Sequence, residues 1–307
     1  MLRRALIAAS ESGRLREIAE NAGAARNVAM RFVAGETLED ALRVARQLNM
    51  LGMRVTLDHL GESVTDEQVA RQHADTSLEI LDAIDERELD GSISVKPTAL
   101  GIDISRELCE DLIGRICKRA ADVGTHVTID MEGSDHTQDT VDLVRSLRER
   151  GHDNVGCAVQ SYLHRTYDDV RLLTGLGASL RLCKGAYSEP EEIAYQERIE
   201  IDRNFVRCAD YVLQGDTYGR FATHDDRLIA RLQHLAGERG VPKDRYEFQM
   251  LYGVREPLQR QLVADGYDLR VYVPFGSEWY PYFVRRIAER PANLTFFLRA
   301  LLGNLRD

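Results

Sequence analysis

The sequence predicts an α/β fold, a (βα)8 barrel of the TIM type with an N-terminal helical layer. From about residue 50 onward, a short β-branched or apolar run is followed by a turn and a longer helical pattern, and this unit occurs eight times. Eight units within about 250 residues are typical of a closed parallel barrel. The alternative, an open doubly wound sheet, usually has fewer strands. Residues 1–50 carry only helical patterns.

The strand–helix units follow one another without a long interruption. Each predicted strand is short and rich in β-branched or other apolar residues, and each predicted helix repeats apolar residues every three or four positions. The predicted strands are 53–59, 92–96, 126–132, 155–160, 179–184, 220–224, 246–251 and 270–275. The predicted helices are 66–86, 105–123, 137–150, a segment from about 166, a segment from about 190, 226–239, 256–266 and 279–290. Such alternation favours parallel strands with helical crossovers.

The first fifty residues are predicted to form helices that pack on the barrel. LREIAENA (15–22) and TLEDALRVARQLN (37–49) both show the apolar spacing of amphipathic helices. No Gly/Ser-rich stretch marks a linker after them. We therefore divide the chain into an N-terminal helical segment, 1–50, and a barrel, 51–307.

Composition limits the kinds of partner. The 307 residues include 40 basic and 50 acidic ones, so the formal net charge is −10. This charge argues against nucleic acid or an anionic membrane as a partner of the whole surface. No apolar run approaches the roughly 20 residues that a membrane-spanning helix needs. Five cysteines without a CxxC pair are predicted to be reduced and mostly buried, which favours a cytoplasmic protein.

Polar side chains follow nearly every predicted strand at its carboxyl end. In a parallel barrel these ends meet on one face, and active sites lie there. This face, called the mouth below, is therefore predicted to be a polar ligand-binding surface. The residues at seven strand ends are Asp58 and His59, Lys96, Asp130 and Glu132, Gln160, Lys184, Thr223 and His224, and Gln249.

A charged stripe runs along the last predicted helix of the barrel, WYPYFVRRIAER (279–290). The stripe is spaced i, i+3, i+4 and i+7 and consists of Tyr282, Arg285, Arg286 and Glu289. A solvated face with i, i+4 ion pairs is the ordinary interpretation. Since the helix follows the eighth strand, however, its first half is expected to border the mouth. There the arginines and Lys96 would bind a small carboxylate or phosphate, while Asp130 and Glu289 would balance the remaining charge.

Other activities are weighed against the same residues. The sequence contains no GxxxxGK[ST], GxGxxG, GxSxG or HExxH motif. DMEGSDH (130–136) offers ligand types for a divalent metal, but a hard-metal site also needs ligands from other strands, so no metal is predicted. Lys96 and Lys184 lie where a Schiff-base lysine of a barrel aldolase would lie. A barrel that binds a small carboxylate without catalysis is the remaining alternative.

Six blocks of the sequence resemble the proline dehydrogenase family, in the family's order and across nearly the whole chain. They are RFVAGE (31–36), SVKPTALG (94–101), RLCKGAY (181–187), ATH (222–224), FQMLYGVR (248–255) and YFVRRIAERPAN (282–293). The resemblance implies a distorted (βα)8 barrel that binds FAD non-covalently. It implies oxidation of L-proline to 1-pyrroline-5-carboxylate, the first step of proline catabolism to glutamate, with hydride transfer to FAD. The length is similar to that of monofunctional bacterial members, which lack the aldehyde dehydrogenase half of bifunctional ones.

The resemblance also implies roles for individual residues. Two arginines and a lysine would bind the proline carboxylate, and two tyrosines and a leucine would enclose its ring. These substrate residues are Lys96, Leu251, Tyr272, Tyr282, Arg285 and Arg286. Arg181 would stabilise negative charge that develops on the flavin, and Asp130 would hold the cations in place. The implied FAD contacts are Met131, Gln160, Lys184, Gly185, Ala186, Thr223 and His224, with Tyr187 and Gln249 as weaker ones.

One position departs from the family pattern, and several partners follow from the resemblance alone. Asp225 follows His224 where the family is expected to carry asparagine, and its charge would alter contacts to FAD. The electrons would pass to a quinone-type acceptor, and the product to a separate pyrroline-5-carboxylate dehydrogenase. LTFFLRALLGNL (294–305) is amphipathic, so attachment to the inner face of a membrane and packing on the barrel are both left open.

Overall fold

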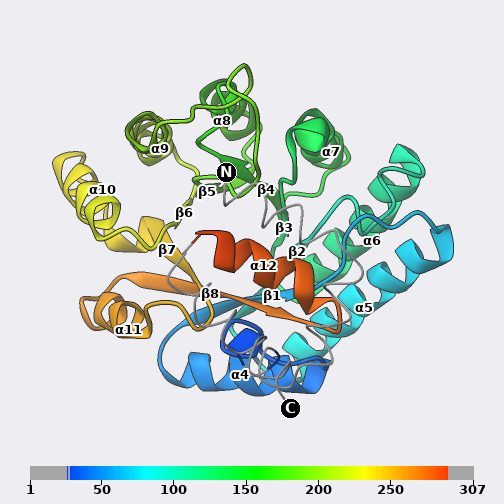
Figure 1. Ribbon diagram of the computed structural model, residues 1–307. Coiled ribbons are helices and arrows are strands. Elements are labelled where there is room, and N and C mark those ends of the chain that lie inside the picture. Colours follow the sequence, from blue (N-terminus) through cyan, green and yellow to red (C-terminus); the bar gives the residue numbers. More distant parts are fainter. Residues whose placement is uncertain (1–25, 27, 290–307) are drawn as a thin grey trace, which may run out of the picture.

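The computed structural model describes residues 26 and 28–289, and its centre is a closed barrel of eight parallel strands in sequence order (Figure 1). The strands are β1 (Arg54–His59), β2 (Gly91–Val95), β3 (Val127–Ile129), β4 (Val155–Gln160), β5 (Ser179–Cys183), β6 (Gly219–Ala222), β7 (Tyr246–Leu251) and β8 (Asp268–Phe275). Pairing of β1 with β8 closes the barrel. Each predicted strand overlaps an observed one, and the predicted TIM-type barrel is confirmed.

Helices alternate with the strands, and all of them except the last cover the outside of the barrel (Figure 1). They are α4 (Leu38–Met50), α5 (Glu67–Glu86), α6 (Arg106–Asp122), α7 (Thr137–Glu149), α8 (Thr166–Gly175), α9 (Arg198–Gln214), α10 (Asp226–Glu238), α11 (Glu256–Ala264) and α12 (Trp279–Glu289), with short 3-10 turns at Ser134–His136 and Lys243–Arg245. Side-chain caps fix several starts: Thr37, Asp66, Ser105 and Asp225 accept hydrogen bonds from the first turns of α4, α5, α6 and α10. Over the described part of the chain, the helices fall short of the length and apolarity that crossing a membrane requires.

The helix after β5 begins later than predicted. The sequence indicated a start near residue 190, but α9 begins at Arg198. The preceding segment instead runs along the rim of the barrel, where it forms an antiparallel bridge to the segment after β4. The carboxylate of Glu189 accepts hydrogen bonds from N (2.8 Å) and Oγ (2.6 Å) of Ser134. These long-range bonds replace the helical ones that the local pattern favours.

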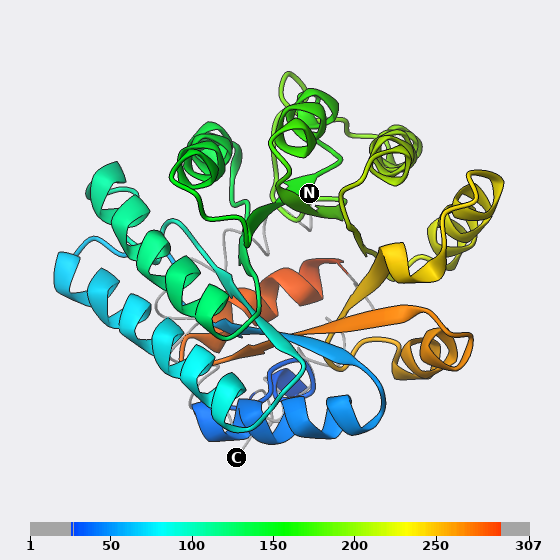
Figure 2. The same ribbon diagram turned by 180° about the vertical axis from the view of Figure 1, so that it is seen from behind.

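Helices α4 and α12 depart from the arrangement of a regular TIM barrel. α4 packs against β1 and β8 on the outside of the barrel, where the helix after β8 lies in a regular TIM barrel (Figure 1). α12 instead crosses one end of the barrel (Figures 1 and 2), and its Arg285 bonds to Glu62 in the loop after β1. A second apolar cluster surrounds α12 and includes Ala29, Val33, Leu60, Trp279, Tyr280, Tyr282, Phe283 and Val284. The prediction that this helix borders the mouth is confirmed.

The predicted helical segment at residues 1–50 is described only in part. α4 agrees with the predicted helix at 37–49 and packs on the barrel as expected. The segments LREIAENA (15–22) and LTFFLRALLGNL (294–305) lie outside the described residues. The division into 1–50 and 51–307 therefore stays a prediction.

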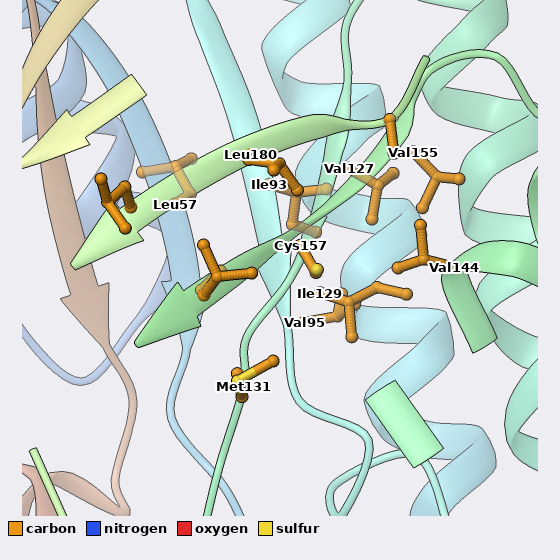
Figure 3. Packing of buried hydrophobic residues seen from close by; sticks show 14 of the residues in the cluster. Leu57, Ile93, Val95, Val127, Ile129, Met131, Val144, Val155, Cys157 and Leu180 are labelled. Atoms are coloured by element: carbon orange, nitrogen blue, oxygen red, sulfur yellow. The ribbon is translucent and has the colours of Figure 1, made fainter. Parts of the chain in front are cut away.

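Alternation along the strands separates an apolar outer layer from a polar interior. Leu57, Ile129 and Cys157 are fully buried between the strands and the helices, and Figure 3 shows Ile129 and Cys157 beside Val144 of α7. Successive strand residues point to opposite faces, so their neighbours point into the barrel. These inward residues include Thr56, Asp58, Ser94, Thr128, Arg181, Gln249 and Arg270, all nearly or fully buried. Barrel interiors are usually filled by branched apolar side chains, so this polar interior calls for a functional explanation.

Candidate active site

A buried ion pair lies at the mouth, at the ends of β1 and β2. Lys96 Nζ lies 2.7 Å from Asp58 Oδ1 and 3.7 Å from Asp130 Oδ2. The sequence had suggested Asp130 as the counter-charge, but Asp58 is the nearer carboxylate. Burial opposes the charge of Lys96, yet the two carboxylates outweigh it and raise the pKa of Lys96. Lys96 is therefore an ammonium group at neutral pH.

Arg181 extends from β5 across the interior and is fixed by three acceptors. Its Nη1 donates to Asp130 Oδ1 (2.6 Å) and to Ser94 Oγ (3.0 Å), and its Nε donates to Gln249 Oε1 (2.7 Å). Its Nη2 is buried and has no hydrogen-bond partner among residues 26 and 28–289. An unpaired buried donor costs free energy, so Nη2 marks a place where a ligand would supply the missing acceptor.

Asp130 joins the two cations to a tyrosine of β8. Its Oδ1 also accepts a hydrogen bond from Ser94 Oγ (2.8 Å), and its Oδ2 accepts one from Tyr272 OH (2.7 Å). Burial opposes the charge of Asp130, but Arg181 and Lys96 hold its pKa below the usual range. Burial and the nearby carboxylate raise the pKa of Tyr272, so its hydroxyl keeps the proton that it donates.

The arginines of α12 lie above this cluster and are not a solvated face. Nη1 and Nη2 of Arg285 lie 2.7 and 2.9 Å from the two carboxylate oxygens of Glu62, a bidentate pairing. The Arg285 side chain is only 13% exposed. Burial opposes the charge of Glu62, but Arg285 outweighs it and lowers the pKa of Glu62. Arg286 Cζ lies 5.2 Å from the ring centroid of Tyr282. The side chain of Glu289 lies outside the described residues.

Several predicted FAD contacts lie at the ends of β3, β4 and β5. Met131 is buried. The amide of Gln160 donates from Nε2 to the Glu132 carbonyl (2.9 Å) and accepts at Oε1 from Ala186 N (3.4 Å). Gly185 has φ +113°, and a Cβ there would collide with the ring of Tyr162. The fold itself therefore requires this glycine, whether or not a cofactor approaches it.

Lys184, at the end of β5, is held by two carboxylates. Its Nζ lies 2.5 Å from Asp202 Oδ1 and 3.2 Å from Asp225 Oδ2. Asp225 also pairs with Arg198 (2.5 Å) and caps α10. Burial opposes the charge of Asp225, but Arg198 and Lys184 hold its pKa far below the usual range. The aspartate at this unexpected position is thus an ionised partner of a predicted cofactor residue.

The remaining predicted residues link the ends of β6 and β7. Thr223 N donates to the Gln249 carbonyl (3.2 Å), and Leu251 N donates to Nε2 of His224 (2.9 Å). Because Nε2 accepts, the proton of neutral His224 is assigned to Nδ1. These bonds hold both loops at the rim of the mouth.

The structure joins Lys96, Asp130, Arg181 and Tyr272 in one bonded cluster, below the stripe on α12. The sequence reasoning missed the pairing roles of Asp58, Glu62 and Ser94 and the bond from Arg181 to Gln249. Asp58 could have been found, since it ends the strand next to Lys96, but Glu62 carries no local signal. Within the described ranges, no group of three or more His, Cys, Asp or Glu residues could hold a metal ion.

This fold and this cluster define a class, the (βα)8-barrel enzymes with a charged ligand site at the strand ends. Comparison with known families narrows the class. The proline dehydrogenase family profile matches residues 41–299. The chain therefore belongs to the proline dehydrogenase family and is an oxidoreductase that acts on proline.

Individual relatives agree with this assignment. Proline dehydrogenase 2 of Bacillus subtilis (strain 168) is 39% identical over 95% of this chain and 96% of its own length. Proline dehydrogenase of Deinococcus radiodurans is 37% identical over 90% of each chain. The crystal structure of proline utilization A (PutA) from Bdellovibrio bacteriovorus, inactivated by N-propargylglycine, matches with a TM-score of 0.79 and 27% identity. That match covers 86% of this chain and 32% of the PutA chain, so this chain spans about a third of that relative's length.

Proposed function

We propose that the chain oxidises L-proline to 1-pyrroline-5-carboxylate with FAD bound at the mouth. The observation that carries the proposal is the buried Nη2 of Arg181, which lacks a partner among the described residues and lies in the same cluster as Asp130, Lys96 and Tyr272. When bound, FAD supplies the acceptor for the hydride that leaves the proline ring. The remaining chemistry belongs to the side chains of the barrel.

The residues at the mouth fit FAD in the kinds of group that they offer. A lysine, a threonine hydroxyl and an imidazole suit phosphate and ribose oxygens, and an amide and a buried guanidinium suit the polar edge of a flavin. The residues that would hold FAD are Met131, Gln160, Lys184, Gly185, Ala186, Thr223 and His224. Lys184 would have to share its charge between a phosphate and its two carboxylates.

The substrate carboxylate would be bound by Arg285, Arg286 and Lys96. The fork of Arg285 already holds one carboxylate, that of Glu62, in bidentate geometry. A substrate carboxylate presents the same two oxygens, so it would be held in the same way by displacing Glu62 from this fork. Tyr272, Tyr282 and Leu251 would enclose the ring and exclude water.

The chemistry asked of the chain is mainly orientation and charge stabilisation. Proline loses a hydride from a ring carbon and a proton from nitrogen to become the imine. Arg181 would stabilise the negative charge that develops at the acceptor. Asp130 keeps Arg181 in place through Nη1 and keeps the Tyr272 hydroxyl in place through Oδ2, so both groups are fixed before substrate arrives.

Further partners belong to the same proposal. Electrons would leave to a quinone-type acceptor, and the product would pass to a separate pyrroline-5-carboxylate dehydrogenase. A cytoplasmic location, with or without contact to the inner face of a membrane, stays a prediction.

The lysine Schiff-base alternative is disfavoured by electrostatics. A Schiff-base lysine must reach its neutral amine form, which a lowered pKa makes accessible. The pKa of Lys96 is raised by Asp58 and Asp130 despite its burial. A barrel that only binds a carboxylate is disfavoured by the family, whose members are named as dehydrogenases.

Three assays test the proposal. Flavin released from the purified protein should have the mass of FAD, and incubation with L-proline should give a product two hydrogens lighter. Borohydride added with candidate aldehydes or keto acids should leave no adduct on Lys96 or Lys184. A colourless protein that gains nothing from added FAD, or an adduct abolished by substitution of either lysine, would overturn the proposal.

A further inference from the structure

The interior of the barrel below the mouth contains a charged group that the proposed reaction does not use. Glu247 of β7 is fully buried, with 0% exposure. It lies two residues before Gln249 on the same strand, so both side chains point into the barrel. Arg270 of β8, also buried, donates from Nε to Glu247 Oε1 (2.8 Å). Burying an ionised carboxylate is costly unless it is paired. A buried charge that the proposed reaction does not use therefore needs another explanation.

Glu247 connects to the mouth through Gln249. Gln249 Nε2 donates to Glu247 Oε1 (2.6 Å), and Gln249 Oε1 accepts from Arg181 Nε (2.7 Å). An amide can present either its oxygen or its nitrogen to a neighbour. An ionised carboxylate only accepts, and an arginine only donates, so this amide has one orientation that satisfies both. The donor and the acceptor of both hydrogen bonds, from Gln249 to Glu247 and from Arg181 to Gln249, are thereby fixed.

The row of hydrogen-bonded side chains is firmly anchored at its Glu247 end, inside the barrel. Nη1 of Arg270 donates to the Val55 carbonyl (2.8 Å) and to Ser92 Oγ (3.2 Å). Arg220 Nε lies 3.6 Å from Glu247 Oε1. Burial opposes the charge of Glu247, but Arg270 and Arg220 hold its pKa below the usual range. Glu247 is thus ionised and held by strands on both sides.

We propose that Glu247 and Gln249 are positioning residues for Arg181, which set the direction in which its Nη2 points at the mouth. The inference rests on the proposed function, in which Arg181 lies beside the electron acceptor. Asp130 and Ser94 hold only Nη1. The Nε bond to Gln249 supplies the second point of attachment, without which the guanidinium plane can turn about its bond to Nη1.

Gln249→Met tests the proposal most simply. Methionine is unbranched and of similar length, so it removes both hydrogen bonds with little change in packing. We expect kcat to fall about tenfold to a hundredfold, because misplacing a catalytic group by about 1 Å has effects of this size. KM for proline should change less than about twofold, since the carboxylate contacts lie elsewhere.

The flavin potential gives a readout that a purely structural residue would not move. A displaced Arg181 stabilises reduced flavin less, so the midpoint potential should become more negative. A tenfold change in that preference corresponds to about 30 mV for a two-electron couple. Flavin content should equal that of the parent.

Thr140→Val is the matched control. It removes another hydrogen bond of a fully buried side chain, from Thr140 Oγ1 to the His136 carbonyl (2.9 Å) at the start of α7, which shares no residue with the bonds that run from Arg270 to Arg181. It should lower the free energy of unfolding without a change in kcat or potential. If Gln249→Met likewise lowers only the free energy of unfolding, the proposal is overturned.

A second variant and a flavin-free measurement keep the inference separate from the proposed function. Glu247→Gln leaves an amide oxygen to accept from Gln249 Nε2 but removes the charge, so Gln249 is held less firmly. We expect kcat and potential to shift in the same direction as in Gln249→Met, by a smaller amount. If Glu247→Gln does not fold, because Arg270 and Arg220 lose a charged partner, Gln249→Met decides alone. Crystal structures of the parent and Gln249→Met apoproteins should show Arg181 turned in the variant. A flavin-free protein would overturn the proposed function, whereas an unmoved Arg181 would overturn this inference.

Discussion

Arg285 and Arg286 are adjacent in sequence but have different surroundings. Arg285 is held in a fork on Glu62, whereas Arg286 lies against the ring of Tyr282. Both lie on α12 at the mouth, where a substrate carboxylate would approach. A planar guanidinium can form two parallel bonds to a carboxylate, and an ammonium group cannot. An arginine-to-lysine change therefore keeps the positive charge but removes the planar group that forms two parallel bonds.

Arg285→Lys and Arg286→Lys should each raise KM for proline. Loss of one charge-assisted hydrogen bond costs about 1.5–3 kcal/mol, which corresponds to roughly ten- to a hundredfold in affinity. kcat should fall as well if the clamp aims the ring, and flavin content should not change. Steady-state kinetics and flavin absorbance provide the measurements.

Arg87→Lys serves as the control for these variants. Arg87 follows the last residue of α5, at the end of that helix away from the mouth, and forms an exposed bidentate pair with Glu39. Its replacement should leave KM unchanged and alter stability little. If KM for proline is also unchanged in Arg285→Lys and Arg286→Lys, these arginines do not bind the substrate.

Asp225, at the start of α10, takes part in two kinds of interaction. This residue caps the helix by accepting from Arg227 N (3.1 Å), and it also competes for the charge of Lys184. Asparagine caps a helix about as well as aspartate. Asp225→Asn therefore removes the competing charge and keeps the cap.

Asp225→Asn should bind FAD more tightly, provided that Lys184 contacts the cofactor. A partly exposed ion pair contributes up to about 1 kcal/mol, so the Kd for FAD should fall by up to about fivefold. Fluorescence titration of the apoprotein measures this constant. Asp210→Asn, which also removes a carboxylate but one paired with Arg239, controls for net charge. Equal or weaker FAD binding by Asp225→Asn than by the parent would separate Lys184 from the cofactor.

Two histidines contact each other at the carboxyl end of β1. The rings of His59, at the end of β1, and His73, on α5, have centroids 5.2 Å apart, and His59 lies 5.4 Å from Phe275. Burial, together with the nearby positive groups, lowers the pKa of His73 from 6.5 to about 4. Burial and Lys96 also lower the pKa of His59. The unfolded chain therefore binds more protons than the folded one between about pH 6.5 and pH 4.

Stability should consequently fall as the pH drops through this window, and it is fully retained above pH 6.5. Replacing His73 by phenylalanine, which keeps a ring and cannot titrate, should reduce this loss by about 1 kcal/mol or more. One pKa unit corresponds to about 1.4 kcal/mol, and the partial exposure of the ring requires a discount. Denaturant unfolding at pH 7 and pH 5 provides the comparison. An equal loss of stability between pH 7 and pH 5 in parent and variant would exclude His73 as its source.

At the scale of the whole molecule, the barrel was predictable because its signal is local. Apolar residues alternate with polar ones along β1, β2 and β7, and each strand is followed by a helical pattern. The polar strand ends predicted the mouth for the same reason. The late start of α9 was not predictable, since the bond between Glu189 and Ser134 joins residues far apart in the chain.

The pairings inside the site were beyond a single sequence. Glu62 and Arg285 are 223 positions apart, and Arg181 and Gln249 are 68 apart. Composition and spacing show that charged residues are present, but they do not show which carboxylate pairs with each cation. Closure of the barrel decides this, because it brings strands such as β2 and β5 to face each other across the interior.

Anaerobic titration of the purified protein with L-proline tests the central claim most directly. The claim is that the polar mouth of this barrel binds FAD and proline together and passes a hydride between them. We expect the visible flavin absorbance to be lost in proportion to the proline added, and to return on admission of an electron acceptor. Bound flavin that stays oxidised at saturating proline would contradict the claim.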